Sequence, residues 1–257
     1  MNRRNFLKKS AVLLSSSFFG FSIFSKALAQ CEPENDSSFQ SSIALIIDDI
    51  GYSIPRARDF LNLNIPITFS VLPRLLNSYN LAVEIHDKGH EIMLHQPMEP
   101  FNSQLDPGPG ALFVRYEQQK ITRIMEENIS IAPYATGVNN HMGSRFTSSG
   151  GEMLEALNVI RDKNLFFIDS LTSGRSVAYK TAKKLQMPTA RRNMFLDNCL
   201  EDNSILRQLQ KLQIHAKIYG HAIGIGHPFP ETARAIRRFI SNYKLPNISL
   251  VHVSDIL

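Results

Sequence analysis

Two adjacent aspartates, Asp48 and Asp49, directly follow the apolar run 43–47. A carboxylate at the end of a buried strand is costly unless it is paired, protonated or bound to a metal. The carboxyl ends of parallel strands are also where open α/β sheets and β/α barrels place their reactive groups. One aspartate could simply cap a following helix. The pair, followed by Gly51, favours a functional site.

Four later apolar runs also end in histidine or aspartate, at His95, His141, Asp169 and His227. Prolines after His95 exclude a regular helix there and predict a rigid loop. His90 lies five residues before His95, and this odd separation on a strand puts the two side chains on opposite faces. We therefore expect His90 to be structural. The recurrence of polar residues at corresponding strand ends predicts one shared site.

Histidine and carboxylate together are the ligands of Zn²⁺ and similar divalent ions, with a position left open for water. A bound ion lowers the pKa of that water, a spare aspartate can take its proton, and a spare histidine can protonate a leaving amine. This chemistry is metal-assisted hydrolysis of an amide or ester. A serine nucleophile is disfavoured, because the chain has no Gly-x-Ser-x-Gly turn.

The elements that must position these residues alternate between strand-like and helix-like patterns. The predicted strands are Ile43–Ile47, Ile67–Val71, Glu91–Leu94, Gly137–Asn140, Leu165–Ile168, Ala222–Gly226 and Ile248–Val253. The predicted helices are Ile54–Leu63, Asn77–Lys88, Arg115–Ile129, Gly151–Lys163, Ser176–Leu185, Glu201–Tyr219 and Glu231–Asn242. This alternation predicts an α/β fold with a parallel sheet, most simply a closed or nearly closed β/α barrel of about seven strands. An open doubly wound sheet is the alternative.

The first 29 residues have the pattern of an export signal. Basic residues precede an apolar stretch that ends at Phe24, and 27–29 forms a small-x-small cleavage site. The pair Arg3 and Arg4 resembles a twin-arginine signal, with an ordinary Sec signal as the alternative. We therefore expect an exported, periplasmic protein whose mature chain has no transmembrane segment.

Residues 30–42 are polar and predict a flexible linker, which leaves 43–257 as a single barrel domain. Cys31 stands where a lipid anchor would attach, but Gln30 before it is not small, so lipidation is disfavoured. Cys31 and Cys199 could also pair, because an oxidising compartment permits disulfides.

The basic balance of the whole chain comes from the leader. The chain has 28 basic and 23 acidic residues, and five of the basic ones, but no acidic one, lie within 1–29. The mature chain therefore has 23 of each and a net charge of zero. Without a basic excess, nucleic-acid binding is not expected.

Six stretches of the chain, taken in order, resemble the divergent polysaccharide deacetylases, distant relatives of the family 4 carbohydrate esterases. They are Ile46–Gly51, Ile67–Pro73, Gly89–Pro100, Asn139–Ser144, Phe167–Ser170 and Ala222–Pro228. The resemblance implies a distorted β/α barrel with a metal site, an acetylated glycan or peptidoglycan-like substrate, and zinc as the metal.

The resemblance also implies roles for particular residues. The first aspartate of the pair in the esterases is the general base and the second binds metal, which carries over to Asp48 and Asp49. His95 matches the first of two metal-binding histidines, and His227 matches the late histidine that serves as general acid.

One position departs from the esterase pattern: the second histidine of the metal-binding pair is replaced by Glu99. Either Glu99 or His141 completes the metal site, and we favour His141. Glu99 would then support a ligand or contact substrate. The same supporting or substrate-binding role is expected for Asn140, Arg145 and Asp169.

The sequence thus predicts a metal-dependent hydrolase that removes acyl groups, chiefly acetyl, from an envelope polysaccharide. A non-catalytic glycan-binding module on the same barrel is the main alternative, and an amidase or esterase acting on other acyl groups is a third. The oligomeric state is left open.

Overall fold

One parallel sheet runs through the part of the chain that the structure describes. This computed structural model describes residues 40–242 and 247–257. The strands lie in the order β6-β5-β4-β3-β2-β1-β8-β7, and β9 pairs with the first residues of β1. They are β1 (Ser41–Ile50), β2 (Thr68–Val71), β3 (Glu91–Met98), β4 (Ala135–Met142), β5 (Phe166–Asp169), β6 (Thr189–Arg191), β7 (Met194–Phe195), β8 (His221–Gly226) and β9 (Ile248–Val251).

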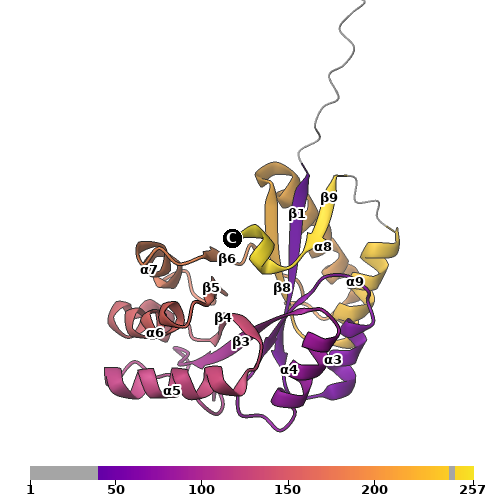
Figure 1. Cartoon of the computed structure of the whole chain (residues 1–257). Coiled ribbons are helices and arrows are strands. Elements are labelled where there is room, and N and C mark those ends of the chain that lie inside the picture. Colours follow the sequence, from indigo (N-terminus) through magenta and orange to yellow (C-terminus); the bar gives the residue numbers. More distant parts are fainter. Residues whose placement is uncertain (1–39, 243–246) are drawn as a thin grey trace, which may run out of the picture. The chain divides into compact units, whose positions relative to one another are not determined.

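Helices connect the strands and lie around the curled sheet (Figure 1). Each predicted helix is present, with its ends shifted by a few residues. The α-helices are α3 (Ile54–Leu61), α4 (Ser78–Asp87), α5 (Gln118–Ile131), α6 (Gly150–Asp162), α7 (Ala178–Lys184), α8 (Asp202–Tyr219) and α9 (Pro230–Asn242). Two 3₁₀ turns are η1 (Phe146–Ser148) and η2 (Val253–Ile256).

The strands bury different residues on their two faces, as their alternation requires. Ala44 and Ile46 of β1 pack with Ile225 of β8 in a buried cluster that includes no residue of the described α-helices. We assign this cluster to the inside of the curl. Leu45, between them, packs with helix residues in a larger outer cluster. Asp48 follows Ala44 and Ile46 at the same two-residue spacing and therefore points to the inside as well. It is only 2% exposed, and its carboxyl group lies at the end of the inner cluster.

The predicted distorted β/α barrel is confirmed, with corrections at its edges and in β3. The rigid loop predicted directly after His95 was wrong, because β3 continues through Pro97 to Met98 and stays paired with β4. Strands β6 and β7 were not predicted, because three and two residues give no periodic pattern. They form the two edges of the sheet and do not pair with each other, so the barrel is open between them. The predicted linker 30–42 was too long at its end, because Ser41 and Ser42 already belong to β1. The predicted export signal and linker residues 30–39, which include Cys31, lie outside the described residues.

A buried carboxylate fixes the last turn of the chain to the sheet. Glu91, at the start of β3, accepts hydrogen bonds from Thr68 Oγ1 at 2.8 Å and from the backbone N–H groups of Val253 and Ser254 at 3.0 and 3.3 Å. These N–H groups begin η2, where helical donors lack partners within the helix. The residues after β9 thereby cover the amino-terminal end of β3.

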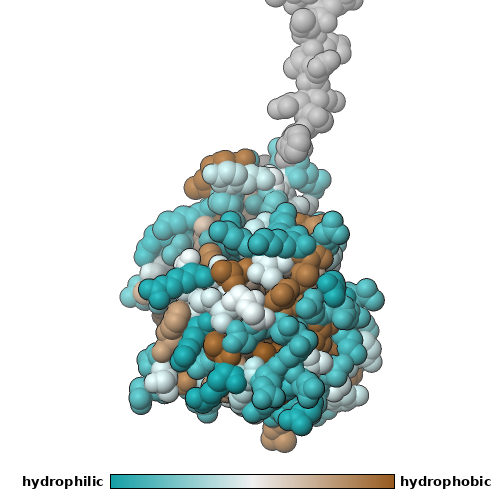
Figure 2. Space-filling view, turned by 90° about the vertical axis from the view of Figure 1, so that its left-hand side faces the viewer, coloured by the Kyte–Doolittle hydropathy of each residue, from teal (hydrophilic) through white to brown (hydrophobic). Residues whose placement is uncertain are grey.

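None of the described helices combines the length and the apolar character needed to cross a bilayer. Hydrophobic residues on the face shown in Figure 2 occur as separate patches bordered by hydrophilic ones. Cys199 is exposed and unpaired among the described residues.

Candidate functional site

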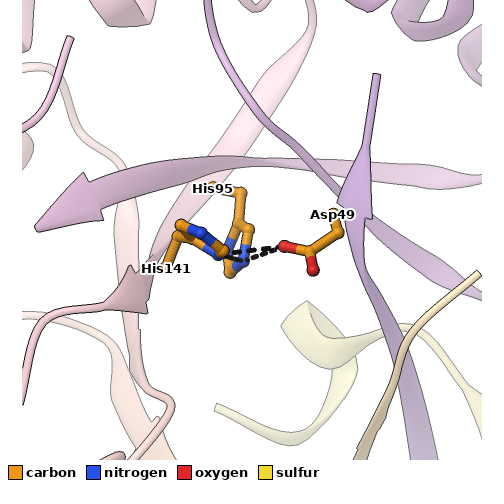
Figure 3. Close-up of side chains that lie close together, drawn as sticks. All are labelled: Asp49, His95 and His141. Carbon is orange, nitrogen blue, oxygen red and sulfur yellow. Dashed lines mark hydrogen bonds and ion pairs between the residues drawn. The ribbon is translucent and has the colours of Figure 1, made fainter. Parts of the chain in front are cut away.

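Three side chains from three strands converge at the carboxyl ends of the sheet (Figure 3). Asp49 Oδ1 of β1 lies 3.2 Å from His95 Nε2 of β3 and 2.9 Å from His141 Nδ1 of β4. The two ring nitrogens are 3.1 Å apart. The structure therefore brings together Asp49, His95 and His141, the three residues predicted to bind metal.

A local break in β1 lets two neighbouring aspartates approach one histidine. Regular alternation would point Asp48 and Asp49 to opposite faces. Asp49, however, has a φ of 57°, in the left-handed region that most residues avoid, and the pairing of β1 with β2 shifts register between Ile47 and Ile50. Asp48 Oδ2 and Asp49 Oδ1 consequently lie 3.7 and 3.2 Å from His95 Nε2. Strain of this kind is often kept at functional sites.

The geometry of the triad fits a divalent ion. Ligand atoms around a tetrahedral zinc ion, with bonds of about 2.0–2.1 Å, are about 3.3 Å apart. The three observed separations are close to this value. Asp49 Oδ1 is moreover buried, and no described residue hydrogen-bonds to it, although two ring nitrogens are near. The two ring nitrogens pair with this oxygen only when the rings are protonated, whereas a cation held between the three atoms would satisfy all of them.

Burial and charge have opposing effects on these groups. Burial alone would raise the pKa of Asp49, but the close rings of His141 and His95 lower it below its usual range. Burial would lower the pKa of His95, and the carboxylates of Asp48 and Asp49 raise it instead. Burial raises the pKa of Asp48, against the charges of His95 and His227. Asp48 is thus a buried carboxyl group of raised basicity beside the triad, as a general base requires.

Asn139 of β4 joins the triad to Asp48. Its Nδ2 donates to Asp48 Oδ1 at 2.8 Å, and its Oδ1 accepts from His95 Nδ1 at 2.7 Å and from the Ser70 hydroxyl. An ionised Asp48 can only accept, so the amide nitrogen must face it and the amide oxygen must face His95. His95 therefore carries its proton on Nδ1. The lone pair of its Nε2 then points toward Asp49 Oδ1 and His141 Nδ1, where a metal ion would lie.

His227, after β8, is fixed by a second carboxylate. Its Nδ1 lies 2.9 Å from Asp197 Oδ1, and its backbone N–H donates to Asp197 Oδ2 at 2.6 Å. Asp197 Oδ2 also accepts from Thr232 Oγ1. Burial would lower the pKa of His227, but the hydrogen bond and charge of Asp197, with the charges of Asp48 and Asp49, raise it to about 9. An imidazolium held in this way suits a general acid.

Glu99 and Arg145 lie outside the triad and bind each other. Glu99 Oε1 is 3.3 Å from Arg145 Nη1, and Glu99 Oε2 accepts the backbone N–H of Val114. Between the two alternatives for the third ligand, the structure places His141, and not Glu99, in the cluster. The predicted contact of Glu99 and Arg145 with substrate stays a prediction.

Asn140 and Asp169 hold loops at the ends of β4 and β5. Asn140 accepts the backbone N–H of Ser170 and donates to the carbonyl oxygen of Met142. Asp169 accepts from the backbone N–H of Leu171 and from the Ser176 hydroxyl. Neither side chain belongs to the triad, and their predicted role toward substrate also stays a prediction.

Three residues of the site were missed by sequence reasoning. Asn139 could have been found, because it lies two residues before His141 and hence on the same face of the strand. Asp197 follows the two-residue strand β7, which has no recognisable pattern. Arg192 lies between two unpredicted strands; its Nε and Nη2 donate to the carbonyl oxygens of Ser170 and Leu171. Burial lowers the pKa of Arg192, and the charges of Asp169 and Asp48 offset this only in part.

Known proteins with a similar sequence or structure agree with this interpretation of the fold. Uncharacterized protein YibQ of Escherichia coli (strain K12) is 33% identical over 215 residues, which are 84% of this chain and 67% of that protein. The crystal structure of uncharacterized protein ATU2773 from Agrobacterium tumefaciens C58 is 26% identical, with a TM-score of 0.78 and coverage of 85% of this chain and 89% of that chain. The catalytic domain of a peptidoglycan N-acetylglucosamine deacetylase from Eubacterium rectale ATCC 33656, at 12% identity, shares the fold alone, with a TM-score of 0.51 over 83% of this chain and 88% of that chain.

The family is shown by a match along nearly the whole described chain. The model for the family described as divergent polysaccharide deacetylase matches residues 45–257. This range includes every residue of the triad, Asp48 and His227, and it confirms the resemblance that the six sequence stretches indicated. The chain belongs to the divergent polysaccharide deacetylase family.

Proposed function

We propose that this protein is a metal-dependent hydrolase that removes acetyl groups from the amino sugars of a cell-envelope glycan. The observation that chiefly supports this proposal is that Asp49, His95 and His141 converge beside Asp48. Asp48 is a buried carboxyl group that is not one of the three proposed metal ligands. A site that only binds glycan has no need of a raised-pKa carboxylate beside three metal-ligand atoms.

Asp49 Oδ1, His95 Nε2 and His141 Nδ1 are the atoms that would hold the ion. Two imidazoles and one carboxylate are a common ligand set of catalytic zinc, so Zn²⁺ is the metal we propose. A divalent ion bound there supplies positive charge that polarises the acyl carbonyl and lowers the pKa of water.

Asp48 and His227 then divide the proton transfers. Asp48, held by Asn139, takes a proton from the water that attacks the acetamide carbonyl carbon. As the C–N bond breaks, His227 gives a proton to the departing nitrogen, and Asp197 stabilises the charged imidazole beforehand. The products are acetate and a free amine on the sugar, so that one water is consumed for each acetyl group removed.

The envelope and the periplasm enter this proposal through the amino-terminal pattern of residues 1–29, which is typical of an export signal. The Eubacterium rectale protein with the same fold acts on peptidoglycan N-acetylglucosamine, as its name states. Acetylated chito-oligosaccharides and peptidoglycan fragments are therefore the first substrates to test.

Metal content tests the ligand set independently of substrate. Elemental mass spectrometry of the purified protein should find near-stoichiometric zinc in the wild type and in Glu99→Ala, but not in Asp49→Ala, His95→Ala or His141→Ala. Glu99→Ala is a matched control, because Glu99 is a neighbouring carboxylate outside the triad. If the protein takes up neither zinc nor cobalt, the proposal of a metal-dependent hydrolase is refuted. A non-catalytic glycan-binding module would then be the better supported function.

Acetate release tests the catalytic roles. We expect Asp48→Asn to keep its metal and to lose turnover of acetylated oligosaccharides. Normal turnover in Asp48→Asn would show that another group is the base.

A further inference from the structure

A cavity of about 510 Å³ lies along strand β6, outside the metal triad. Its volume is in the range of sites that bind small organic molecules. Residues of α7, β6, the start of β8, the turn η2 and the loops after β5 and β6 form its walls. The cationic, aromatic and aliphatic side chains of these walls include Leu171, Tyr179, Lys183, Arg191, Arg192 and Ile256.

Three of these residues are cations that form no ion pair, although the charges of Asp169 and Asp48 act on Arg192 from a greater distance. Among the described residues, no aspartate or glutamate forms an ion pair with Lys183, Arg191 or Arg192. Leu257 also lines the cavity. Several cations that line one cavity create a positive potential there, which raises the local concentration of anions.

Two of the cations lie next to the same aromatic ring. The guanidinium of Arg191 lies 4.8 Å from the centre of the Tyr179 ring, and the Lys183 ammonium lies 5.8 Å from it. The ring holds the two charges on one wall of the cavity. With Leu171 and Ile256, it also provides apolar surface against which the face of a sugar ring can pack.

Arg192 connects the cavity to the catalytic residues. Its guanidinium donates to the carbonyl oxygens of Ser170 and Leu171 and lies 3.6 Å from the centre of the Phe195 ring. The ring of His227 stacks on the same Phe195 ring, with centroids 5.9 Å apart. One aromatic ring therefore separates a half-buried cation of the cavity from the proposed general acid.

We propose that this cavity binds an acidic sugar unit of the glycan, a pyranose that carries a carboxylate or a phosphate. The charges recognise the anionic group, because guanidinium groups match planar carboxylates and phosphates. Tyr179 and the apolar residues contact the ring. This inference rests on the proposed function, since it makes the cavity a subsite next to the sugar that loses its acetyl group.

Calorimetric titration of the purified full chain with three monosaccharides tests the proposal. N-acetylmuramic acid carries a carboxylate, N-acetylglucosamine 6-phosphate carries a phosphate, and N-acetylglucosamine carries neither on the same ring. We expect an acidic sugar to bind roughly tenfold more tightly than the neutral one at low salt, and this preference should shrink as salt is added. The stronger of the two acidic sugars identifies the anionic group.

Single substitutions locate the binding. Lys183→Gln and Arg191→Gln should each weaken binding of the acidic sugar by roughly two- to fivefold, as is typical of one exposed charge pair. Lys184→Gln is the matched control, because Lys184 is the exposed neighbour of Lys183 on α7 and does not line the cavity. None of the three lies in the catalytic machinery.

Two results would overturn the proposal. One is equal binding of the neutral and both acidic sugars, and the other is an equal loss in Lys184→Gln and Lys183→Gln. Absence of acetate release from every glycan would instead refute the proposed function, and this binding measurement would be unaffected because it needs no turnover.

Discussion

Replacing Asn139 with alanine removes the side chain that orients both a metal ligand and the proposed base. The change deletes three hydrogen bonds, to the Ser70 hydroxyl, His95 Nδ1 and Asp48 Oδ1. His95 then has no acceptor that fixes its proton on Nδ1, and Asp48 has no amide donor. We expect weaker metal binding and slower turnover from a protein that still folds.

The size of each effect can be worked out from the contacts. Loss of the hydrogen bond that orients a metal ligand typically lowers metal affinity by about 10–100-fold, or about 1.4–2.7 kcal/mol. Buried partners left without a hydrogen bond cost about 1–3 kcal/mol each in the free energy of unfolding, less where water fills the space. The Asn139 bond also lowers the pKa of Asp48, which burial raises. Its loss therefore raises that pKa further.

The pH dependence of turnover distinguishes the loss of these hydrogen bonds from a general structural defect, because the direction of its shift can be predicted. Asp48 is active as a carboxylate, so activity is present above its pKa and is lost as the pH falls through it. In Asn139→Ala the acidic limb of the rate profile should move to higher pH. Zinc titration of the metal-free protein should show the lower affinity in parallel.

Asn140→Ala is the matched control, because Asn140 is the adjacent buried amide and bonds only to loop groups outside the triad. It should lose stability, yet keep its zinc affinity and its acidic limb. The orienting role of Asn139 would be refuted by a folded Asn139→Ala protein with wild-type zinc affinity and an unshifted profile, or by an Asn140→Ala protein that loses zinc equally.

Three further predictions concern the acid, the metal and the last turn of the chain. His227 acts as an acid only while it is protonated, so activity should fall as the pH rises through a pKa of about 9; Asp197→Asn should move this alkaline limb towards the ordinary value of about 6.5, and an unmoved limb in the rate profile would contradict the pairing. Chelation should lower the melting temperature of the wild type by roughly 5–10 °C, because an ion at a hundred times its Kd adds about 2.7 kcal/mol, and an equal drop in Asp49→Ala would place the ion elsewhere. Glu91→Ala leaves the Ser254 N–H without an acceptor, while the Val253 N–H keeps Thr68 Oγ1, and should lower the free energy of unfolding in a urea titration by about 1–3 kcal/mol, with zinc affinity unchanged; a parallel loss of zinc affinity would link this region to the site.

The fold could be predicted where buried strands and amphipathic helices carry a clear pattern. Strands such as β1 and β8 are long apolar runs, and helices such as α8 have apolar residues at helical spacing, so both were found. The short strands β6 and β7 were not, because their pairing with β5 and β8 depends on tertiary position and not on a local signal. Their absence from the prediction also hid the open edge of the barrel.

The site could be predicted as far as side chains follow strand ends in a parallel sheet. That rule predicted one site shared by the aspartates and histidines at the strand ends. The family resemblance then indicated Asp49 and His95 as ligands, with His141 preferred to Glu99, and these three side chains converge in the structure. The rule could not supply Asp197 or Arg192, which come from irregular chain between and beside unpredicted strands. It also could not show that the φ of 57° at Asp49 brings two neighbouring aspartates to one histidine.

The pairing of β1 has a consequence for when the protein becomes able to bind its metal. This first strand carries both aspartates, and two of its three partners, β8 and β9, come from the last part of the described chain. During synthesis, β1 must therefore wait for segments that leave the ribosome much later, and such long-range pairing is slow. A site that is built from β1, β3 and β4 cannot take its final geometry before that step, and an unformed site does not retain an ion. The ion that the protein acquires should then be set by the compartment in which β1 finds its last partners.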